Sequence, residues 1–174
     1  MTNASRASNL SAARLAQIAM AWLLLCCISS ATAQSSVFIN ELHYDNVGTD
    51  VGEAIEVAGP AGSALNGWSI VLYNGSNGSS YNTLNLTGSL TDQCGGLGTQ
   101  FISLPVNGLQ NGSPDGLALV DDGSNVLQFL SYEGSFAATD GPANGLTSTD
   151  IGVAEGGGTQ IGESLQLTGT GQFA

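Results

Sequence analysis

Short apolar runs, separated by stretches rich in Gly, Asn, Ser, Asp and Thr, are the feature that most limits what this chain can fold into. None of the runs repeats its apolar residues at the three- and four-residue spacing of an amphipathic helix. The first run instead alternates, which places Val37 and Ile39 on one face of a predicted strand and Phe38, Asn40 and Leu42 on the other. Further strands are predicted at residues 54–57, 68–73, 81–86, 101–104, 117–120, 126–130 and 165–167.

This series of short strands predicts an all-β fold, an antiparallel β-sandwich of about 7–8 strands. Within one of these strands, Ile70 and Leu72 share a face with Trp68, whereas Val71 and Tyr73 share the other face. Apolar residues on both faces are typical of a strand that is covered on both sides. We expect Trp68, the largest of these side chains, to anchor the core between the two sheets.

Three connections between the predicted strands carry further information. Residues 113–116 combine a proline with a permissive glycine, as a tight turn does. Residues 121–125 join two apolar runs and predict a hairpin. Residues 136–162 are polar and too long for an ordinary connection, so we expect either a functional surface loop or a partly mobile segment.

Residues 1–33 have the pattern of a secretory signal peptide. A polar leader precedes an apolar run at residues 15–28, and Ala31-Thr32-Ala33 is a suitable cleavage site. The run is short for a membrane span, so a retained anchor is the less favoured alternative. We therefore predict cleavage near Ala33, a secreted protein in the extracellular or periplasmic space, and one β-sandwich domain at residues 34–174.

Cleavage of the signal peptide changes the charge of the chain. It removes both basic residues, Arg6 and Arg14, and leaves all 14 acidic ones, so the net charge falls by two, from −12 to −14. Because Lys and Arg are the main ligands of phosphate backbones, we expect no direct binding of nucleic acid unless a divalent cation bridges the two. Anionic membranes should be avoided for the same reason. So many unpaired carboxylates favour an exterior that is rich in salt or calcium.

The best candidate site is the loop between the first two predicted strands. Asp45, Asn46, Asp50 and Glu53 lie within nine residues there, and Glu41 is close enough in sequence to join them. Oxygen ligands of this kind suit a hard cation, and two glycines allow the loop to fold around one. The pattern lacks the register of an EF-hand. We predict a Ca2+ site, with a solvated acidic turn as the alternative.

The sequence offers little for catalysis, and we predict that the protein is not an enzyme. His43 is the one histidine, and we interpret it as structural because no nucleophile motif accompanies it. Together with Cys94, the one cysteine beyond the signal peptide, it falls short of a zinc site. We expect Cys94 to be a buried or idle thiol, with intermolecular pairing as the alternative. Paired carboxylates leave glycoside hydrolysis open as an alternative.

Several segments, taken in order, resemble a bacterial secreted lamin tail domain. They are INELHYDNVGTDVGEAIEV, LNGW, QNGSPDGLALV, DIGV and SLQL. The resemblance implies an immunoglobulin-like antiparallel β-sandwich, and an accessory module of the kind found beside extracellular nuclease or phosphatase domains. The family usually continues beyond SLQLTG with a further strand and a proline-containing tail, so the resemblance predicts that residues 34–174 are truncated at the C-terminal end.

Three functions are therefore open. The leading one is a non-catalytic secreted lamin-tail-type module for binding, adhesion or scaffolding, with calcium as a stabilising ion. The second is the N-terminal accessory part of an extracellular nuclease or phosphatase whose catalytic domain is absent from this chain. The third is a small stand-alone hydrolase. The partner is then an extracellular molecule of unknown kind or an adjoining catalytic domain.

Overall fold

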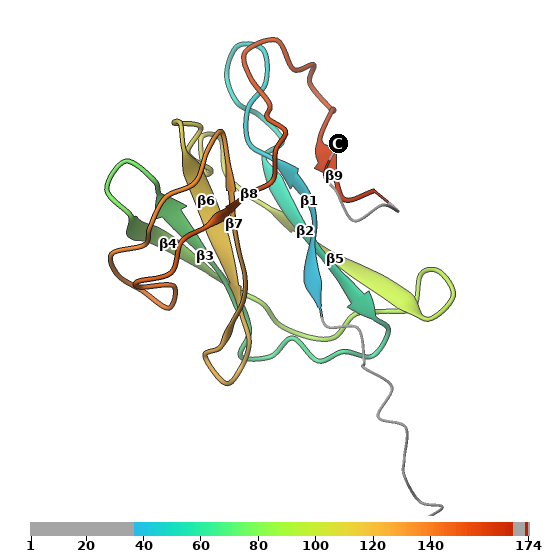
Figure 1. The fold of residues 1–174 in the computed structure, drawn as a ribbon. Coiled ribbons are helices and arrows are strands. Elements are labelled where there is room, and N and C mark those ends of the chain that lie inside the picture. The colour runs from blue at the N-terminus through green and yellow to red at the C-terminus, as the bar shows by residue number, and fades with distance from the viewer. Residues whose placement is uncertain (1–36, 169–172, 174) are drawn as a thin grey trace, which may run out of the picture. The chain divides into compact units, whose positions relative to one another are not determined.

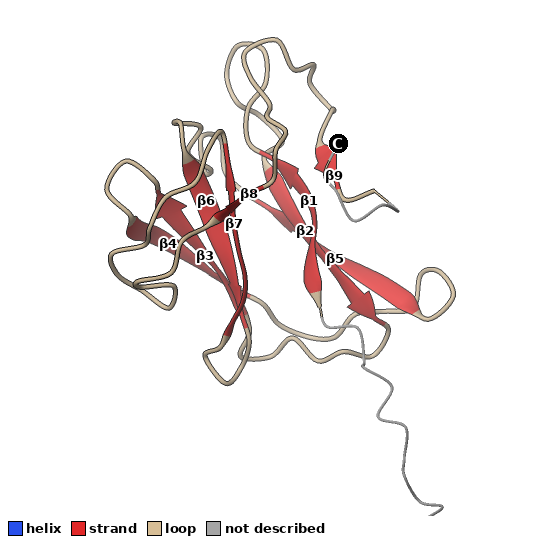
Figure 2. Ribbon diagram, viewed as in Figure 1, coloured by secondary structure: helices blue, strands red, loops and turns tan. Residues whose placement is uncertain are grey.

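Nine β-strands form the regular secondary structure of the computed structural model, which describes residues 37–168 and 173 (Figure 1). The described residues contain strands and loops only (Figure 2), and no helix among them could cross a membrane. The predicted signal peptide, residues 1–33, lies outside the described residues. The strands are β1 (Phe38–His43), β2 (Ala54–Pro60), β3 (Ser69–Asn74), β4 (Ser79–Asn85), β5 (Leu97–Ser103), β6 (Asp115–Val120), β7 (Val126–Tyr132), β8 (Thr149–Asp150) and β9 (Leu165–Gln166).

The strands form two sheets, which confirms the predicted immunoglobulin-like β-sandwich. The four-stranded sheet has the order β5-β2-β1-β9, and the five-stranded sheet has the order β4-β3-β6-β7-β8. Neighbouring strands are antiparallel, except that β8 runs parallel to β7. All eight predicted strands are present. The one strand of the structure that was not predicted is β8, whose two residues are too few to show an alternating pattern.

The main hydrophobic core lies between the inner faces of the two sheets. Tyr44 and Tyr132 stack within it, with ring centroids 3.8 Å apart and an angle of 16° between the rings. Trp68 packs against this core but is only partly buried, so the expectation that it anchors the core is wrong. The largest fully buried side chains are tyrosines instead. The aliphatic centre is formed by Ile39, Leu42, Ile55, Val57, Leu65, Ile70, Leu72, Leu117 and Leu119.

One predicted alternation is wrong because β1 is irregular. The sequence places Ile39 and Leu42 on opposite faces, yet both are buried in the same core. The pairing of β1 with β2 shifts register between Ile39 and Glu41, as a β-bulge does. The extra residue, Asn40, turns the rest of β1 over, so that Glu41 and not Leu42 lies on the outer face.

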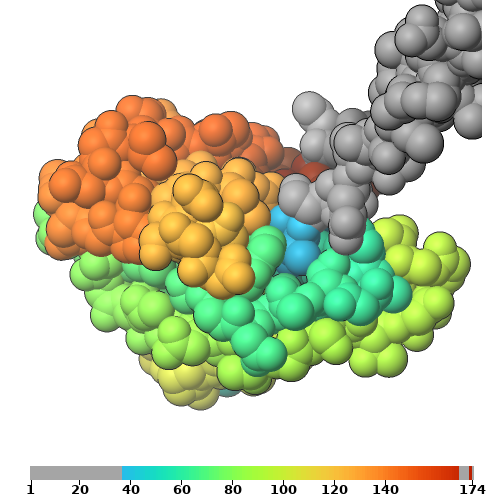
Figure 3. All heavy atoms as spheres, turned by 90° about the horizontal axis from the view of Figure 1, so that it is seen from below, coloured from blue at the N-terminus to red at the C-terminus, as the bar shows by residue number. Residues whose placement is uncertain are grey.

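A second apolar cluster covers the outer face of the five-stranded sheet. Val71 and Tyr73 of β3 belong to it, which confirms that β3 is covered on both sides. The cover is residues 133–148, the first part of the long connection that was expected to be a functional or partly mobile loop. In Figure 3 the orange atoms of this part of the chain lie next to green atoms from the part that contains β3 and β4. It contributes Phe136, Ala138 and Ala143 to the cluster.

Hydrogen bonds fix the covering segment in place. Its backbone folds back on itself, with Ala138 N–H donating to the carbonyl of Leu146 (2.9 Å). Ala143 N–H donates to the hydroxyl of Tyr73 (3.0 Å), which ties the segment to the sheet. The ring of Phe136 meets that of Phe129 edge-on, at 5.3 Å and 87°. The segment is therefore a built part of the sandwich.

Candidate functional site

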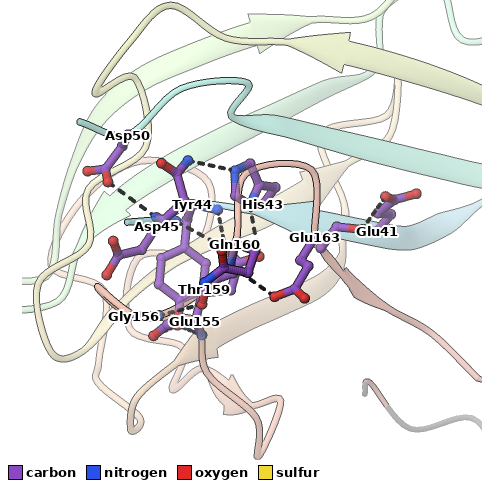
Figure 4. Close-up of polar contacts among 12 residues, drawn as sticks. Glu41, His43, Tyr44, Asp45, Asp50, Glu155, Gly156, Thr159, Gln160 and Glu163 are labelled. Carbon is purple, nitrogen blue, oxygen red and sulfur yellow. Dashed lines mark hydrogen bonds and ion pairs between the residues drawn. The ribbon is translucent and has the colours of Figure 1, made fainter. Parts of the chain in front are cut away.

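The loop between β1 and β2 is held by Glu155, which lies in the connection from β8 to β9 (Figure 4). The Glu155 side chain is buried, and its two oxygens face three donors. His43 Nδ1 donates to Oε1 at 2.8 Å. The backbone N–H groups of Tyr44 and Asp45 donate to Oε2 at 2.5 Å and 3.0 Å. One carboxylate thereby joins the end of β1 to a segment more than a hundred residues further along the chain.

His43 is enclosed on both sides of its ring. Because the carboxylate of Glu155 can only accept, Nδ1 carries the hydrogen. The other ring nitrogen, Nε2, lies 3.0 Å from the side-chain amide nitrogen of Asn46. The same amide nitrogen donates to the carbonyl of Val51 at 2.9 Å. The imidazole thus links β1, the β1–β2 loop and Glu155, and both of its nitrogens are engaged within the protein.

Tyr44 completes the link to the five-stranded sheet. Its hydroxyl accepts the backbone N–H of Glu155 (2.8 Å) and donates to Oε1 of Glu133 (3.2 Å). Burial raises the pKa of the Tyr44 hydroxyl well above its ordinary value, so it stays neutral and keeps donating. The Tyr44 ring also stacks on Tyr132 of β7, so this side chain connects the end of β1 with the five-stranded sheet.

Of the five residues predicted to bind calcium, three lie together. Asp50 Oδ1 accepts the backbone N–H of Asn46 (3.3 Å), and its Oδ2 accepts the side-chain amide of Asn111 (3.0 Å). Burial raises the pKa of Asp45, and the neighbouring Asp50 carboxylate raises it further by a smaller amount. Asn46 is 1% exposed, and its Oδ1 has no hydrogen-bond partner among the described residues. The loop therefore gathers two carboxylates and one unsatisfied amide oxygen.

The other two predicted ligands lie elsewhere. Glu53 is fully buried and accepts the backbone N–H groups of Gly108 (2.6 Å) and Leu109 (3.1 Å). Burial raises its pKa, and these two hydrogen bonds oppose the rise. Glu41 accepts the hydroxyl of Ser164 at 2.5 Å, and Figure 4 shows it well apart from Asp45 and Asp50. Within residues 37–168 and 173, no three acidic, His or Cys side chains form a metal-binding group.

Two grooves adjoin this loop. One, of about 380 Å3, lies beside Asp50 and Asp115 and is otherwise lined largely by amides, hydroxyls and backbone of residues 107–114. Asp115 itself is occupied, because it accepts the backbone N–H groups of Gly75 (2.9 Å) and Gly112 (2.7 Å). The other groove, of about 310 Å3, lies on the outer face of the four-stranded sheet and includes Glu41 and Phe101. Cys94 is an exposed free thiol near the start of β5, so the expectation that it is buried is wrong.

Comparison with known proteins adds no assignment, because no protein-family model, curated protein or solved structure matches the chain. The chemistry of the site therefore has to be argued from its geometry. Glu155 is the side chain of this site that the sequence did not reveal. Its local context, Glu155-Gly156-Gly157-Gly158, is that of a plain loop, and nothing near it in sequence points to His43.

Proposed function

We propose that this protein is a non-catalytic exported module of the lamin tail type, which binds or scaffolds other molecules. The observation that carries the proposal is that the one imidazole and its carboxylate partner are both used as structural ties. His43 faces Glu155 and Asn46, and Glu155 receives three donors. A general base needs a free nitrogen within reach of a nucleophile or water, and this arrangement offers none.

Charge and sequence resemblance support the same proposal. Both basic residues of the chain, Arg6 and Arg14, precede the sandwich, so its surface is acidic and unsuited to nucleic acid. The order of the lamin-tail-like segments follows the sandwich from β1 to β9. Export follows from the signal-peptide pattern. Mass spectrometry of the exported protein should find an N-terminus near Gln34, and an intact Met1 terminus would contradict export by cleavage.

The catalytic alternative is tested by an activity panel. The purified protein is assayed with nuclease, phosphatase and glycosidase substrates, with and without calcium, beside a His43→Gln variant. We expect no turnover above the blank from either protein. Turnover by the parent that the His43→Gln variant loses would overturn the proposal.

We also propose that calcium stabilises the β1–β2 loop through Asp45, Asp50 and the Oδ1 atom of Asn46. Two adjacent carboxylates and a buried amide oxygen without a partner support this. Glu53 and Glu41 are left out of the ligand set because Glu53 is buried against the backbone of Gly108 and Leu109, and Glu41 lies well apart from Asp45 and Asp50 (Figure 4).

Thermal melts in EDTA and in millimolar calcium test the calcium proposal. Calcium at about a hundred times its Kd stabilises a protein that binds it only when folded by roughly 2.7 kcal/mol. We expect the parent to melt higher in calcium and Asp50→Asn to lose that rise. The control is Asp122→Asn, which removes one charge from the turn between β6 and β7. An equal rise in all three proteins would show charge screening and contradict a site.

A further inference from the structure

The open side of β5 is hydrogen-bonded over only half of its length. β5 is an edge strand, paired on one side with β2. On its other side, Leu97 exchanges backbone hydrogen bonds with Cys94 (3.1 and 3.2 Å), and Thr99 N–H donates to the side chain of Gln93 (3.0 Å). Alternate residues of a strand direct their backbone groups to the same side, so the backbone N–H and C=O groups of Phe101 and Ser103 also face the open side. No described strand pairs with them there.

This edge lacks the features that normally protect an edge strand. Natural edges are blunted by charged side chains, proline or a covering segment. β5 reads LGTQFIS and contains no charge and no proline. It also exposes large apolar side chains, since Leu97 is 52% and Phe101 is 61% exposed. An uncharged, apolar edge of this kind is a template for a further strand.

Next to Phe101, the outer face of the sheet carries a row of carboxylates. Phe101 pairs with Glu56 of β2, and Glu56 pairs with Glu41 of β1, so the three side chains lie in line on one face. Like charges directly opposite each other destabilise a sheet. Among the described residues, the side chains that donate hydrogen bonds to them are neutral, namely Asn40 to Glu56 and Ser164 to Glu41. The sandwich contains no Lys or Arg that could balance this row.

Phe101 and Glu41, the two ends of the row, line the groove of about 310 Å3. Ile161, which is 65% exposed, and Glu163 line the same groove. The groove therefore combines apolar contact surface with two acidic side chains, Glu41 and Glu163. Such a lining suits the aliphatic stem and charged head of a Lys or Arg side chain.

We propose that an extended, basic segment of another protein adds to the edge of β5 at Phe101 and Ser103. Its backbone pairs with theirs, and an Arg or Lys side chain crosses the Phe101 ring toward Glu56 and Glu41. An added strand lies about 4.8 Å from β5 and so about 10 Å from β2, a gap that an Arg and a Glu side chain span together. The ring and the carboxylates attract the same positive group. This inference rests on the proposed binding function and names the class of partner.

Other occupants fit the same surface less well. A second copy of this chain would set its own acidic row against the first, with no basic residue in either sandwich. A bare cation would answer the carboxylates but would leave Phe101 and the open backbone of β5 without a role. Nucleic acid brings negative charge to an acidic face.

The test measures fluorescence anisotropy of a labelled octapeptide with alternating Arg and Thr, titrated with the purified protein at low salt. Two matched peptides serve as references: one with Glu in place of Arg, and one with a central proline that cannot extend a sheet. We expect saturable binding of the Arg–Thr peptide only. Phe101→Ala and the double variant Glu41→Gln/Glu56→Gln should each weaken it by roughly tenfold or more.

Matched variants separate this site from general attraction between opposite charges. Asp122→Asn and Leu127→Ala change an acidic and an exposed apolar residue at and beside the turn between β6 and β7, and should leave the affinity unchanged. Equal loss in Asp122→Asn and in the Glu variants, or equal affinity for the proline peptide, would overturn the inference. So would dimers of the free protein that the Phe101→Ala change dissociates. Failure here with no turnover in the activity panel would leave the proposed function standing, whereas turnover lost in His43→Gln would overturn that function alone.

Discussion

The outer faces of the two sheets differ in how far they are covered. On the five-stranded sheet, residues 133–148 cover the outer face and bury Val71, Tyr73 and Phe136 in a second apolar cluster. On the four-stranded sheet, the outer face instead carries an open groove of about 310 Å3, which is lined by residues that include Glu41, Phe101 and 161–164. That face carries Phe101, which is 61% exposed, beside partly exposed carboxylates.

This difference shows which apolar residues serve folding and which are free for other contacts. Phe136 and Phe101 have the same side chain, and each lies on the outer side of a sheet. Phe136 meets Phe129 edge-on and is 8% exposed, so its burial contributes to stability. Phe101 is 61% exposed, so it contributes much less burial to the folded protein and stays accessible for other contacts.

Replacing each phenylalanine by alanine gives the largest expected contrast. Phe136→Ala should lower the free energy of unfolding by about 3–5 kcal/mol, because it leaves a cavity under the covering segment. Phe101→Ala should change it by no more than about 0.5 kcal/mol. Chemical denaturation of both variants measures the two values. Similar losses in both would mean that the two faces do not differ in the way described.

The connection between β8 and β9 has a polar anchor, Glu155. Glu155→Ala removes the acceptor of three buried donors and should cost about 2–3 kcal/mol. The control is Glu163→Ala, which changes an exposed residue of the same connection and should cost well under about 1 kcal/mol. Denaturation midpoints again provide the measurement. A mild effect of Glu155→Ala would show that the β1–β2 loop holds its shape without the tie.

Buried and exposed acids should respond to pH in opposite directions, with a smaller effect. Burial raises the pKa of Glu53 and of Asp115 in the folded protein. Their contribution to stability is therefore complete below the ordinary carboxyl pKa and is lost as pH rises through the raised values. Hydrogen bonds from Asn125 and Ser80 lower the pKa of the exposed Asp121 and Asp140, whose contribution is lost as pH falls through those values.

We therefore expect the melting temperature to be higher at about pH 5 than at about pH 8, and to fall again below about pH 4. Melts across this range in constant salt measure the profile. Glu53→Gln should flatten the fall on the alkaline side. A profile that rises steadily from about pH 5 to about pH 8 would contradict the direction of the buried shifts.

The alternation within single strands was enough to predict the sheets and even the two-sided burial of β3. Val71 and Tyr73 are apolar in a position that an uncovered sheet would fill with polar residues, so the covered face was visible in the sequence. The bulge at Asn40 could not be predicted from the sequence, because its one-residue shift depends on pairing with β2. The sequence also could not show which segment covers β3, since residues 133–148 lack the period of a strand or a helix.

The candidate site was predictable only as far as it is local. Asp45 and Asp50 lie in one short loop, and the structure brings them together. Glu53 and Glu41 are just as near in sequence, but each belongs to a different contact, with Gly108 in one case and Ser164 in the other. These contacts join distant parts of the chain, as does the tie between His43 and Glu155. A sequence pattern records spacing along the chain and carries no sign of such meetings.

Amide hydrogen exchange, resolved by residue, tests most directly the proposal that the open edge of β5 pairs with an added strand. The free protein and its mixture with the Arg–Thr peptide are compared. We expect the amides of Phe101 and Ser103 to exchange quickly in the free protein and to be protected by the peptide, while β4, the edge of the five-stranded sheet, stays unchanged. Protection of β4 to the same degree, or no protection of Phe101 and Ser103 at peptide saturation, would contradict the claim.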